Sequence, residues 1–209
     1  MHLNSIKQNI RLYLLYSILT MTLQSCGSSY MATYPDSWSK PVHPAQGVCP
    51  NIAGEFENKA SDAPGNTSFK LHQKHPLYLS DILTSGTLIK GYKHKWITRV
   101  KFSAIDKGQL NAEFYKNEKM IHHKTFTLEK DFTCTEEGLL IESHYDKVYE
   151  IGGGGRQITQ LFFTKGQDGT LILKMVSKES GLALPLLIPM LFSQKTVSFY
   201  RFNRFGQRL

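Results

Sequence analysis

The sequence contains three cysteines, Cys26, Cys49 and Cys134, and their chemistry depends on where the protein resides. A thiol can accept a lipid, form a disulfide, bind a metal or act as a nucleophile, and its neighbours and compartment select among these uses. Cys26 differs from the other two because an apolar run ends just before it. The nature of that run therefore decides how each of the three thiols is interpreted.

Residues 1–25 have the organisation of a secretory signal peptide. The charged side chains near the start are Lys7 and Arg11, and an uncharged apolar run from residue 12 to residue 23 follows them. This run is too short to cross a bilayer, which requires about 20 apolar residues. The alternative is a buried helix that starts a domain, but no amphipathic period or capping residue accompanies the run. A basic start, a short apolar stretch and small residues at its end predict an export signal.

The residues Leu23-Gln24-Ser25-Cys26 resemble the lipobox of bacterial lipoproteins, in which an aliphatic residue lies three positions before the cysteine and a small residue one position before it. The resemblance implies cleavage before Cys26 and acylation of its thiol with palmitate or similar chains. Two or more such chains would hold the protein firmly on a membrane. Gly27 stands where an aspartate would favour the inner membrane, so the resemblance points to the outer membrane and a periplasm-facing protein. The alternative is ordinary signal cleavage that leaves a spare thiol.

Acylation of Cys26 would leave Cys49 and Cys134 as the two remaining thiols in an oxidising compartment. Such a pair is expected to form a disulfide. The spacing of the two cysteines fits neither a catalytic CxxC motif nor a metal-binding pair. We therefore expect a Cys49–Cys134 disulfide, which by the chain-entropy estimate contributes roughly 4 to 5 kcal/mol before any strain is subtracted.

The composition is that of a basic globular chain. It has 209 residues and a formal net charge of +8, and the part after the leader is long enough for one domain with a sizeable core. A basic surface can contact lipid phosphate or envelope polyanions, or it can serve solubility alone. No dense block of lysine and arginine and no nucleic-acid motif is present. We therefore expect a membrane contact through the lipid and no nucleic-acid partner.

Two regions follow the leader. Residues 26–48 are predicted to be a lipidated cysteine and a flexible tether, because prolines and small polar residues dominate there. Residues 49–209 are predicted to be a β-domain, in which apolar and polar residues alternate over 96–102 and 110–115 and a hairpin turn signal occupies 165–169. Seven or eight short strands with tight turns are expected from this pattern. The predicted fold is a mainly β, single antiparallel meander that forms a closed or partly open, lipocalin-like barrel with one or two short helices, and a sandwich is the alternative.

The start of the β-domain carries a second resemblance. The residues Cys49-Pro50-Asn51-Ile52-Ala53-Gly54-Glu55-Phe56 look like the Cys-Pro-x-(Ile/Leu)-x-Gly-x-(Phe/Tyr) start of a group of small proteobacterial lipoproteins. That group also has a cysteine before a Gly-Leu strand, as Cys134 precedes Gly138, and an Asp-Gly-x-Leu hairpin, which Asp168 begins here. The resemblance supports the fold and the location and implies no activity.

Other residue types that could do chemistry lack the spacing that their chemistry needs. His122 and His123 are adjacent, so on a strand they point to opposite faces and cannot easily share a metal. His72 and His75 precede a proline that disfavours the helix on which they could chelate. The run 152–155 lacks the ending of a phosphate loop, and no Gly-x-Ser-x-Gly or His-Glu-x-x-His motif occurs. We therefore expect no catalytic residues, metal or cofactor.

The most unusual stretch is residues 181–192, which is apolar throughout and contains two prolines. It is too short and too interrupted to span a membrane. It could be a core-packed loop that plugs one end of a barrel, or an apolar rim that touches lipid or gates an apolar cavity. The rim is the functional interpretation, and its predicted ligand- or partner-binding residues are Leu182, Leu184, Leu186, Leu187, Ile188, Met190 and Phe192.

These observations predict an exported, lipid-anchored protein that binds an apolar or amphiphilic ligand or a cell-envelope partner without catalysis. The alternatives are an envelope scaffold or assembly factor and an envelope hydrolase. A ligand binder should have a roomy apolar interior, whereas a scaffold should have a filled interior and an exposed patch. A hydrolase should bring polar residues together in a cleft.

Overall fold

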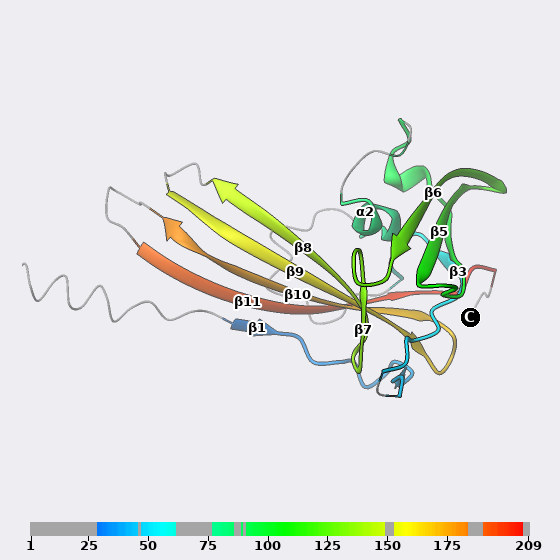
Figure 1. The fold of residues 1–209 in the computed structure, drawn as a ribbon, viewed down its shortest axis with the longest axis horizontal. Coiled ribbons are helices and arrows are strands. Elements are labelled where there is room, and N and C mark those ends of the chain that lie inside the picture. Colours follow the sequence, from blue (N-terminus) through cyan, green and yellow to red (C-terminus); the bar gives the residue numbers. More distant parts are fainter. Residues whose placement is uncertain are drawn as a thin grey trace, which may run out of the picture. The chain divides into compact units, whose positions relative to one another are not determined.

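The structure is a computed structural model of the chain, and it describes residues 29–45, 47–61, 77–85, 89, 91–148, 153–183 and 190–206. These residues form strands, one short α-helix, α2 (Leu79–Leu83), and one 3-10 helix, η2 (His94–Trp96) (Figure 1). The strands are β1 (Ser29–Met31), β2 (Pro41–Val42), β3 (Gly54–Glu57), β4 (Arg99–Phe102), β5 (Gln109–Lys116), β6 (Lys119–Thr127), β7 (Thr133–Thr135), β8 (Gly138–Val148), β9 (Gly153–Gly166), β10 (Leu171–Ala183) and β11 (Met190–Phe202). The prediction of a mainly β protein is therefore confirmed.

The chain divides into two compact units. The first consists of Met1–Ser29, His144–Gln157 and Lys178–Lys195, and the second consists of Tyr30–Ser143, Ile158–Ser177 and Thr196–Leu209. Strands β8 to β11 each contribute residues to both units. No helix among the described residues combines the length and hydropathy that a membrane span requires.

Strands β3, β4, β5 and β6 form a four-stranded antiparallel sheet in that order. The alternation in β5 works as the sequence predicts, because Leu110, Ala112 and Phe114 are buried while the residues between them are not. The alternation predicted from residue 96 begins later than expected. Strand β4 starts at Arg99, and Trp96 belongs to η2 and is exposed, so the 3-10 turn breaks the period of two.

The other sheet has the order β1-β11-β10-β9-β8-β7 (Figure 1). Strand β2 pairs with β9 and makes this sheet seven-stranded. The predicted hairpin between β9 and β10 is present. The Gly166 N–H donates to the Thr170 carbonyl oxygen at 2.8 Å, and Gly169 closes the turn with φ of 82°.

The core lies in the second unit and draws on both sheets. Phe56 of β3, Phe102 of β4 and Phe163 of β9 are almost fully buried. The ring centroids of Phe56 and Phe102 are 6.2 Å apart, and those of Phe102 and Phe163 are 6.5 Å apart. Leu79 and Leu83 place one face of α2 in the same cluster. Aromatic rings therefore fill the centre of this unit.

Two sheets replace the predicted single meander, and within the described residues the strand order of neither sheet closes into a barrel. The cause lies in the turn after β6. Glu129 adopts a positive φ of 64°, and the Asp131 carboxylate accepts the Thr127 N–H at 2.8 Å. Phe132 therefore returns to bridge Leu128 locally, and the next strand, β7, pairs with β8 and not with β6.

The sheets are nevertheless joined by backbone hydrogen bonds at β3. The Glu57 N–H donates to the Asn203 carbonyl and the Phe205 N–H donates to the Glu55 carbonyl, each at 2.9 Å. Phe56 and Arg204 form an antiparallel bridge between these two bonds. The residues that follow β11 therefore extend the hydrogen bonding of β3 on the side opposite β4.

Candidate functional site

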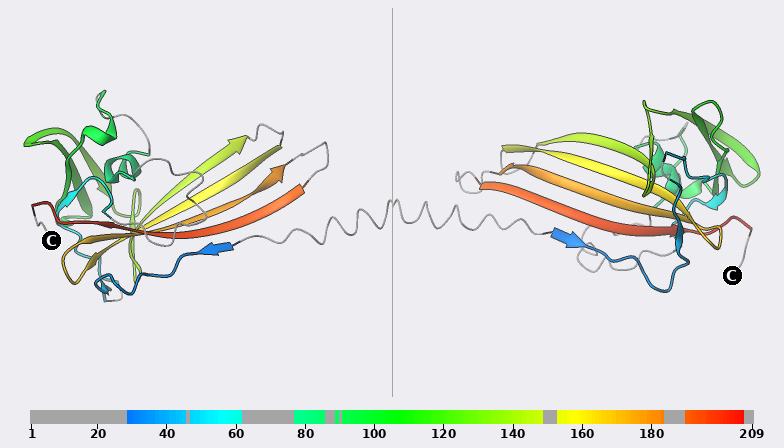
Figure 2. Two further views of the ribbon diagram at one scale, coloured as in Figure 1. Left: turned by 180° about the vertical axis from the view of Figure 1, so that it is seen from behind. Right: turned by 60° about the horizontal axis from the view of Figure 1, so that its bottom comes forward.

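Cys26, the predicted lipid attachment site, lies outside the described residues. The described residues that follow it begin in a strand. Ser29 begins β1 only three residues later, and β1 is the neighbour of β11 (Figure 2). The Ala32 N–H then donates to the Val197 carbonyl at 3.1 Å. Three residues span at most about 10 Å. A lipid on Cys26 would therefore be held within about that distance of β1.

Part of the segment predicted as a flexible tether, within residues 29–45, packs onto the seven-stranded sheet. Trp38 is only 5% exposed, and the edge of the Tyr34 ring meets it at a centroid distance of 5.7 Å. Tyr34 also contacts Phe199 of β11 at 5.5 Å. Backbone pairing of Val42 with Lys165 continues the attachment. Prolines and small residues suggested a linker, but the aromatic side chains provide enough buried surface to hold the segment in place.

Asp168, in the hairpin between β9 and β10, forms hydrogen bonds both within this hairpin and to β11. Its Oδ1 accepts hydrogen bonds from the Thr170 N–H at 3.0 Å and the Thr170 hydroxyl at 2.7 Å, and its Oδ2 accepts one from Arg201 at 2.9 Å. Burial by itself would raise the pKa of the Asp168 carboxyl, but the hydrogen bonds from Thr170 and the charge of Arg201 outweigh it and lower the pKa. The aspartate of the Asp-Gly-x-Leu motif thus links the hairpin to Arg201 of β11.

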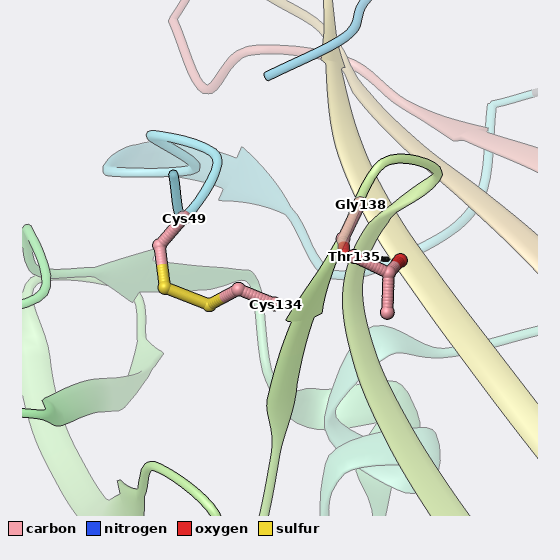
Figure 3. The surroundings of a disulfide bond; sticks show 4 residues. All are labelled: Cys49, Cys134, Thr135 and Gly138. Carbon is pink, nitrogen blue, oxygen red and sulfur yellow. Dashed lines mark hydrogen bonds between the residues drawn. A yellow bond between two sulfur atoms is a disulfide. The ribbon is translucent and has the colours of Figure 1, made fainter. Parts of the chain in front are cut away.

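The disulfide predicted between Cys49 and Cys134 is present (Figure 3). It joins the segment before β3 to β7, with the two Cα atoms 5.0 Å apart, and both cysteines pack against the core. The Thr135 hydroxyl donates to the Gly138 carbonyl at 2.9 Å and closes the turn into β8. Ile52, the isoleucine of the Cys-Pro-x-Ile start, is buried in the same core, which explains an apolar residue at this position.

Only part of the predicted apolar binding segment falls within the described residues. Leu184, Leu186, Leu187 and Ile188 lie outside them, and Met190 and Phe192 belong to β11 without described side chains. Leu182, near the end of β10, is half-buried. Leu191, which was not among the predicted residues, is 73% exposed. Its position two residues before the exposed Ser193 on β11 is the strand alternation that could have identified it.

Ser80, His94 and Asp81 lie close together in a combination of residue types that hydrolases use. The Ser80 hydroxyl is 3.0 Å from His94 Nδ1, and Asp81 Oδ1 is 3.4 Å from His94 Nε2. Ser80 is 0% exposed, however, so its oxygen cannot reach a substrate. Asn58 donates to the carbonyls of His94 and Ile97 and accepts the Ser80 N–H. These polar groups therefore fasten α2 to the η2 loop.

A second polar cluster surrounds Arg99 on the outer face of the four-stranded sheet. Its guanidinium makes two hydrogen bonds to the Glu118 carboxylate, at 3.0 and 2.9 Å. It also lies 4.5 Å from the Tyr115 ring and 4.8 Å from the Phe205 ring. The hydrogen bonds to Glu118 raise the pKa of Arg99, and those from Arg99 lower the pKa of Glu118. The cluster holds the residues after β11 against β4 and β5.

The remaining candidates do not form a site. The His122 ring stacks on Phe114 at a centroid distance of 5.6 Å. Its centroid lies 6.3 Å from that of the His123 ring, which is exposed. Gly153, Gly154 and Gly155 are strand residues of β9 and do not form a phosphate-binding loop before a helix. In the described part of the chain, no group of three or more histidine, cysteine, aspartate or glutamate side chains could hold a metal.

No protein-family model matches this sequence, and no curated protein or solved structure matches it significantly. Two features of the described residues stand out: the β1–β11 edge, which begins three residues after Cys26 in the sequence, and the exposed Leu191 near the start of β11.

Proposed function

We propose that the protein is a lipoprotein of the bacterial outer membrane, anchored through Cys26 and facing the periplasm, which binds an apolar or amphiphilic partner without catalysis. The observation that carries the proposal is the position of β1. It begins three residues after Cys26 and lies beside β11, where Leu191 is exposed. Ser29 and Leu191 also belong to the same compact unit. A lipid on Cys26 would therefore be attached to the same unit as this exposed apolar side chain, which supports the proposal.

The binding surface in this proposal is the segment of residues 182–192, here called the tip. Among its residues with described side chains, Leu191 is exposed and Leu182 is half-buried. The apolar sequence of the segment and the exposure of Leu191 support a contact with lipid or protein. The filled core of the second unit favours such a surface contact over a ligand enclosed among Phe56, Phe102 and Phe163. The same observation supports the second candidate function, an envelope scaffold, which would use the tip to hold a protein partner.

The relation between the two sheets is a further part of the proposal. We propose that the two sheets are parts of one partly open, lipocalin-like barrel. Support comes from β3, which is hydrogen-bonded to β4 on one side and to residues 203–205 on the other. Hydrogen exchange tests this arrangement, because the Glu57 and Phe205 amides should exchange as slowly as those in the centre of β5.

Mass spectrometry of the protein extracted from its native membrane tests the anchor. The expected mass begins at Cys26 and includes acyl chains, and reduction should add one hydrogen to each of Cys49 and Cys134. A chain that keeps residues 1–25 or lacks acyl groups would contradict the lipoprotein proposal. This outcome would leave the disulfide and the fold unaffected.

Binding of anilinonaphthalene sulfonate, a dye that fluoresces on apolar surfaces, tests the tip in the full chain carrying Cys26→Ser. Leu191→Asp should weaken dye binding about tenfold, since burial of a leucine side chain is worth about 1.5 to 3 kcal/mol. Ser193→Asp is the matched control, because it adds the same charge at an exposed position of the same strand. Equal effects of both variants would show that the added charge, and not the leucine, controls binding.

A further inference from the structure

One end of the four-stranded sheet carries a cluster of lysines and aromatic residues that the proposed function does not use. Two segments form it: the η2 loop and the turn between β5 and β6. Its members, here called the Trp96 patch, are Tyr92, Lys93, Lys95, Trp96, Lys116, Lys119 and Met120.

The fold holds the two segments of the Trp96 patch together. The Thr98 N–H donates to the Tyr115 carbonyl at 2.8 Å, and the Asn117 N–H donates to the Thr98 hydroxyl at 2.9 Å. Lys116 Nζ lies 5.3 Å from the Tyr92 ring centroid and 5.7 Å from that of Trp96. These contacts make one continuous surface from residues that are far apart in the sequence.

The apolar members of the patch are open to water. Trp96 is 44% exposed and Met120 is 49% exposed, although Ile97 and Val100 beside them are buried in the core. The four lysines of the patch are exposed as well. Packing of the core therefore gives no reason for an indole ring at position 96, and a contact outside the protein does.

The charge of the four-stranded sheet is distributed unequally between its two ends. The turns at the opposite end carry two lysines, Lys107 and Lys130, together with three carboxylates, Asp106, Glu129 and Asp131. These turns meet where the Leu128 N–H donates to the Gly108 carbonyl at 2.7 Å. The two segments of the patch carry four lysines and one carboxylate, Glu118, and that carboxylate is paired with Arg99.

We propose that the Trp96 patch docks on the surface of a bilayer that contains anionic lipids. Lysines near such a surface are attracted to lipid phosphate groups, and the attraction is worth about 1 kcal/mol for each. Tryptophan and tyrosine favour the headgroup region, where the ring is partly desolvated and its polar edge stays wet. A soluble polyanion would satisfy the lysines alone and leave the indole and Met120 in water. The exposed apolar side chains therefore favour a membrane.

Vesicle binding by the chain that begins at residue 26 and carries Cys26→Ser tests this proposal, because neither acyl chains on Cys26 nor the apolar leader can then account for binding. The protein should sediment with vesicles of phosphatidylglycerol and phosphatidylcholine, and not with phosphatidylcholine vesicles alone. Added salt should weaken the binding, since ions screen charges at an exposed surface. The emission of Trp96 should shift to shorter wavelength, while Trp38, the other tryptophan, is already buried.

Two pairs of substitutions separate the patch from the overall charge. Lys95→Gln with Lys119→Gln should weaken vesicle binding about fivefold for each lysine. Lys107→Gln with Lys130→Gln removes the same charge at the opposite end of the sheet and should leave affinity within about twofold of the original. All four side chains are exposed, so both variants are expected to fold, and their thermal midpoints check this.

Three results would overturn the proposal. The first is the absence of binding to anionic vesicles, and the second is an equal loss of affinity in the two pairs of variants. The third is binding without a shift in Trp96 emission, accompanied by equally tight binding to soluble polyphosphate, which would show that the patch recognises a polyanion and not a bilayer. None of these results bears on acylation of Cys26, which mass spectrometry tests separately.

Discussion

Asp168 connects parts of the chain that are far apart in the sequence. Its carboxylate binds Thr170 in the same hairpin and Arg201 near the end of β11. It also lies near Tyr34, whose pKa is raised mainly by burial and further by the charge of Asp168. A single carboxylate thus stabilises the turn and connects it to β11.

Asp168→Asn should destabilise the protein by about 1.5 to 3 kcal/mol, the usual range for a hydrogen bond to a charged group. Because the folded protein lowers the pKa of Asp168, the charged form favours folding. Its contribution is complete above the unfolded pKa, near 4, and is lost as the pH falls through the lower folded value. Thermal midpoints measured by circular dichroism should therefore fall less steeply with acidification in Asp168→Asn than in the original protein. Parallel curves would contradict this role.

Gly138 is required by its backbone conformation and by a close contact. Its φ is 138°, and an added β-carbon would lie 2.5 Å from the Phe163 carbonyl oxygen. Gly138→Ala should therefore cost at least about 1 to 3 kcal/mol from backbone strain, and more from the clash. Urea unfolding measures this loss. Gly47→Ala, at an exposed glycine with positive φ but nothing within 4 Å of the added atom, separates the strain from the clash.

Among the elements, β7 depends most on a covalent link, because it has only three residues and pairs with β8 alone among the described strands. The disulfide fixes it to the segment before β3 across a sequence separation of 85 residues. Such a loop is long, so cross-linking it removes much of the conformational entropy of the unfolded chain.

The double variant Cys49→Ala with Cys134→Ala should lose about 4 to 5 kcal/mol of unfolding free energy, measured in urea. The single variants, with one free thiol each, should lose a similar amount. A double variant as stable as the original would show that the core alone holds β3 and β7 in place.

The elements that the sequence predicts correctly are those with local signals. The alternation of β5 and the turn between β9 and β10 each depend on neighbouring residues, so a single stretch of sequence is sufficient to identify them. The pairing of residues 29–42 with β9 and β11 depends on residues more than 100 positions away. Prolines in that segment indicated a linker, and no local pattern reveals that Tyr34, which contacts Trp38, also finds a partner in Phe199.

The candidate site was predictable to the same limited degree. The cysteine pair is a combinatorial signal, and the disulfide that it predicts is present. The resemblance of residues 23–26 to a lipobox is a local signal, and it stays a prediction because Cys26 lies outside the described residues. The Trp96 patch gives neither kind of signal, because it requires the η2 turn to interrupt a strand-like alternation and the β5–β6 turn to meet it.

At the scale of the whole molecule, both ends of the described chain are built into sheets. Residues 29–42 pair with β11 and β9, and residues 203–205 pair with β3. Residues 29–42 and 203–205 are therefore parts of the folded domain. A cut or substitution at either end is therefore expected to affect the sheets to which it belongs.

Trp38→Ala should release the N-terminal segment and accelerate chymotryptic cleavage after Tyr30, because burial of Trp38 holds this segment on the sheet. Removal of a buried tryptophan side chain typically costs about 3 to 5 kcal/mol. Trp96→Ala is the matched control, since Trp96 is exposed and its substitution should leave the cleavage rate at Tyr30 unchanged. Cleavage sites identified by mass spectrometry would distinguish local release from general unfolding, which would expose many aromatic residues at once.

The attachment of residues 29–42 to β9 and β11 also sets the order in which the protein can fold. A chain is made from its N-terminus, so the strands that receive this segment are among the last to be synthesised. Contacts between the start and the end of a chain form slowly, because a long loop must close first. Until β11 is complete, residues 29–31 lack the strand beside which they lie in the finished fold. If Cys26 is acylated as proposed, the modifying enzyme would therefore meet it on a chain that is still open.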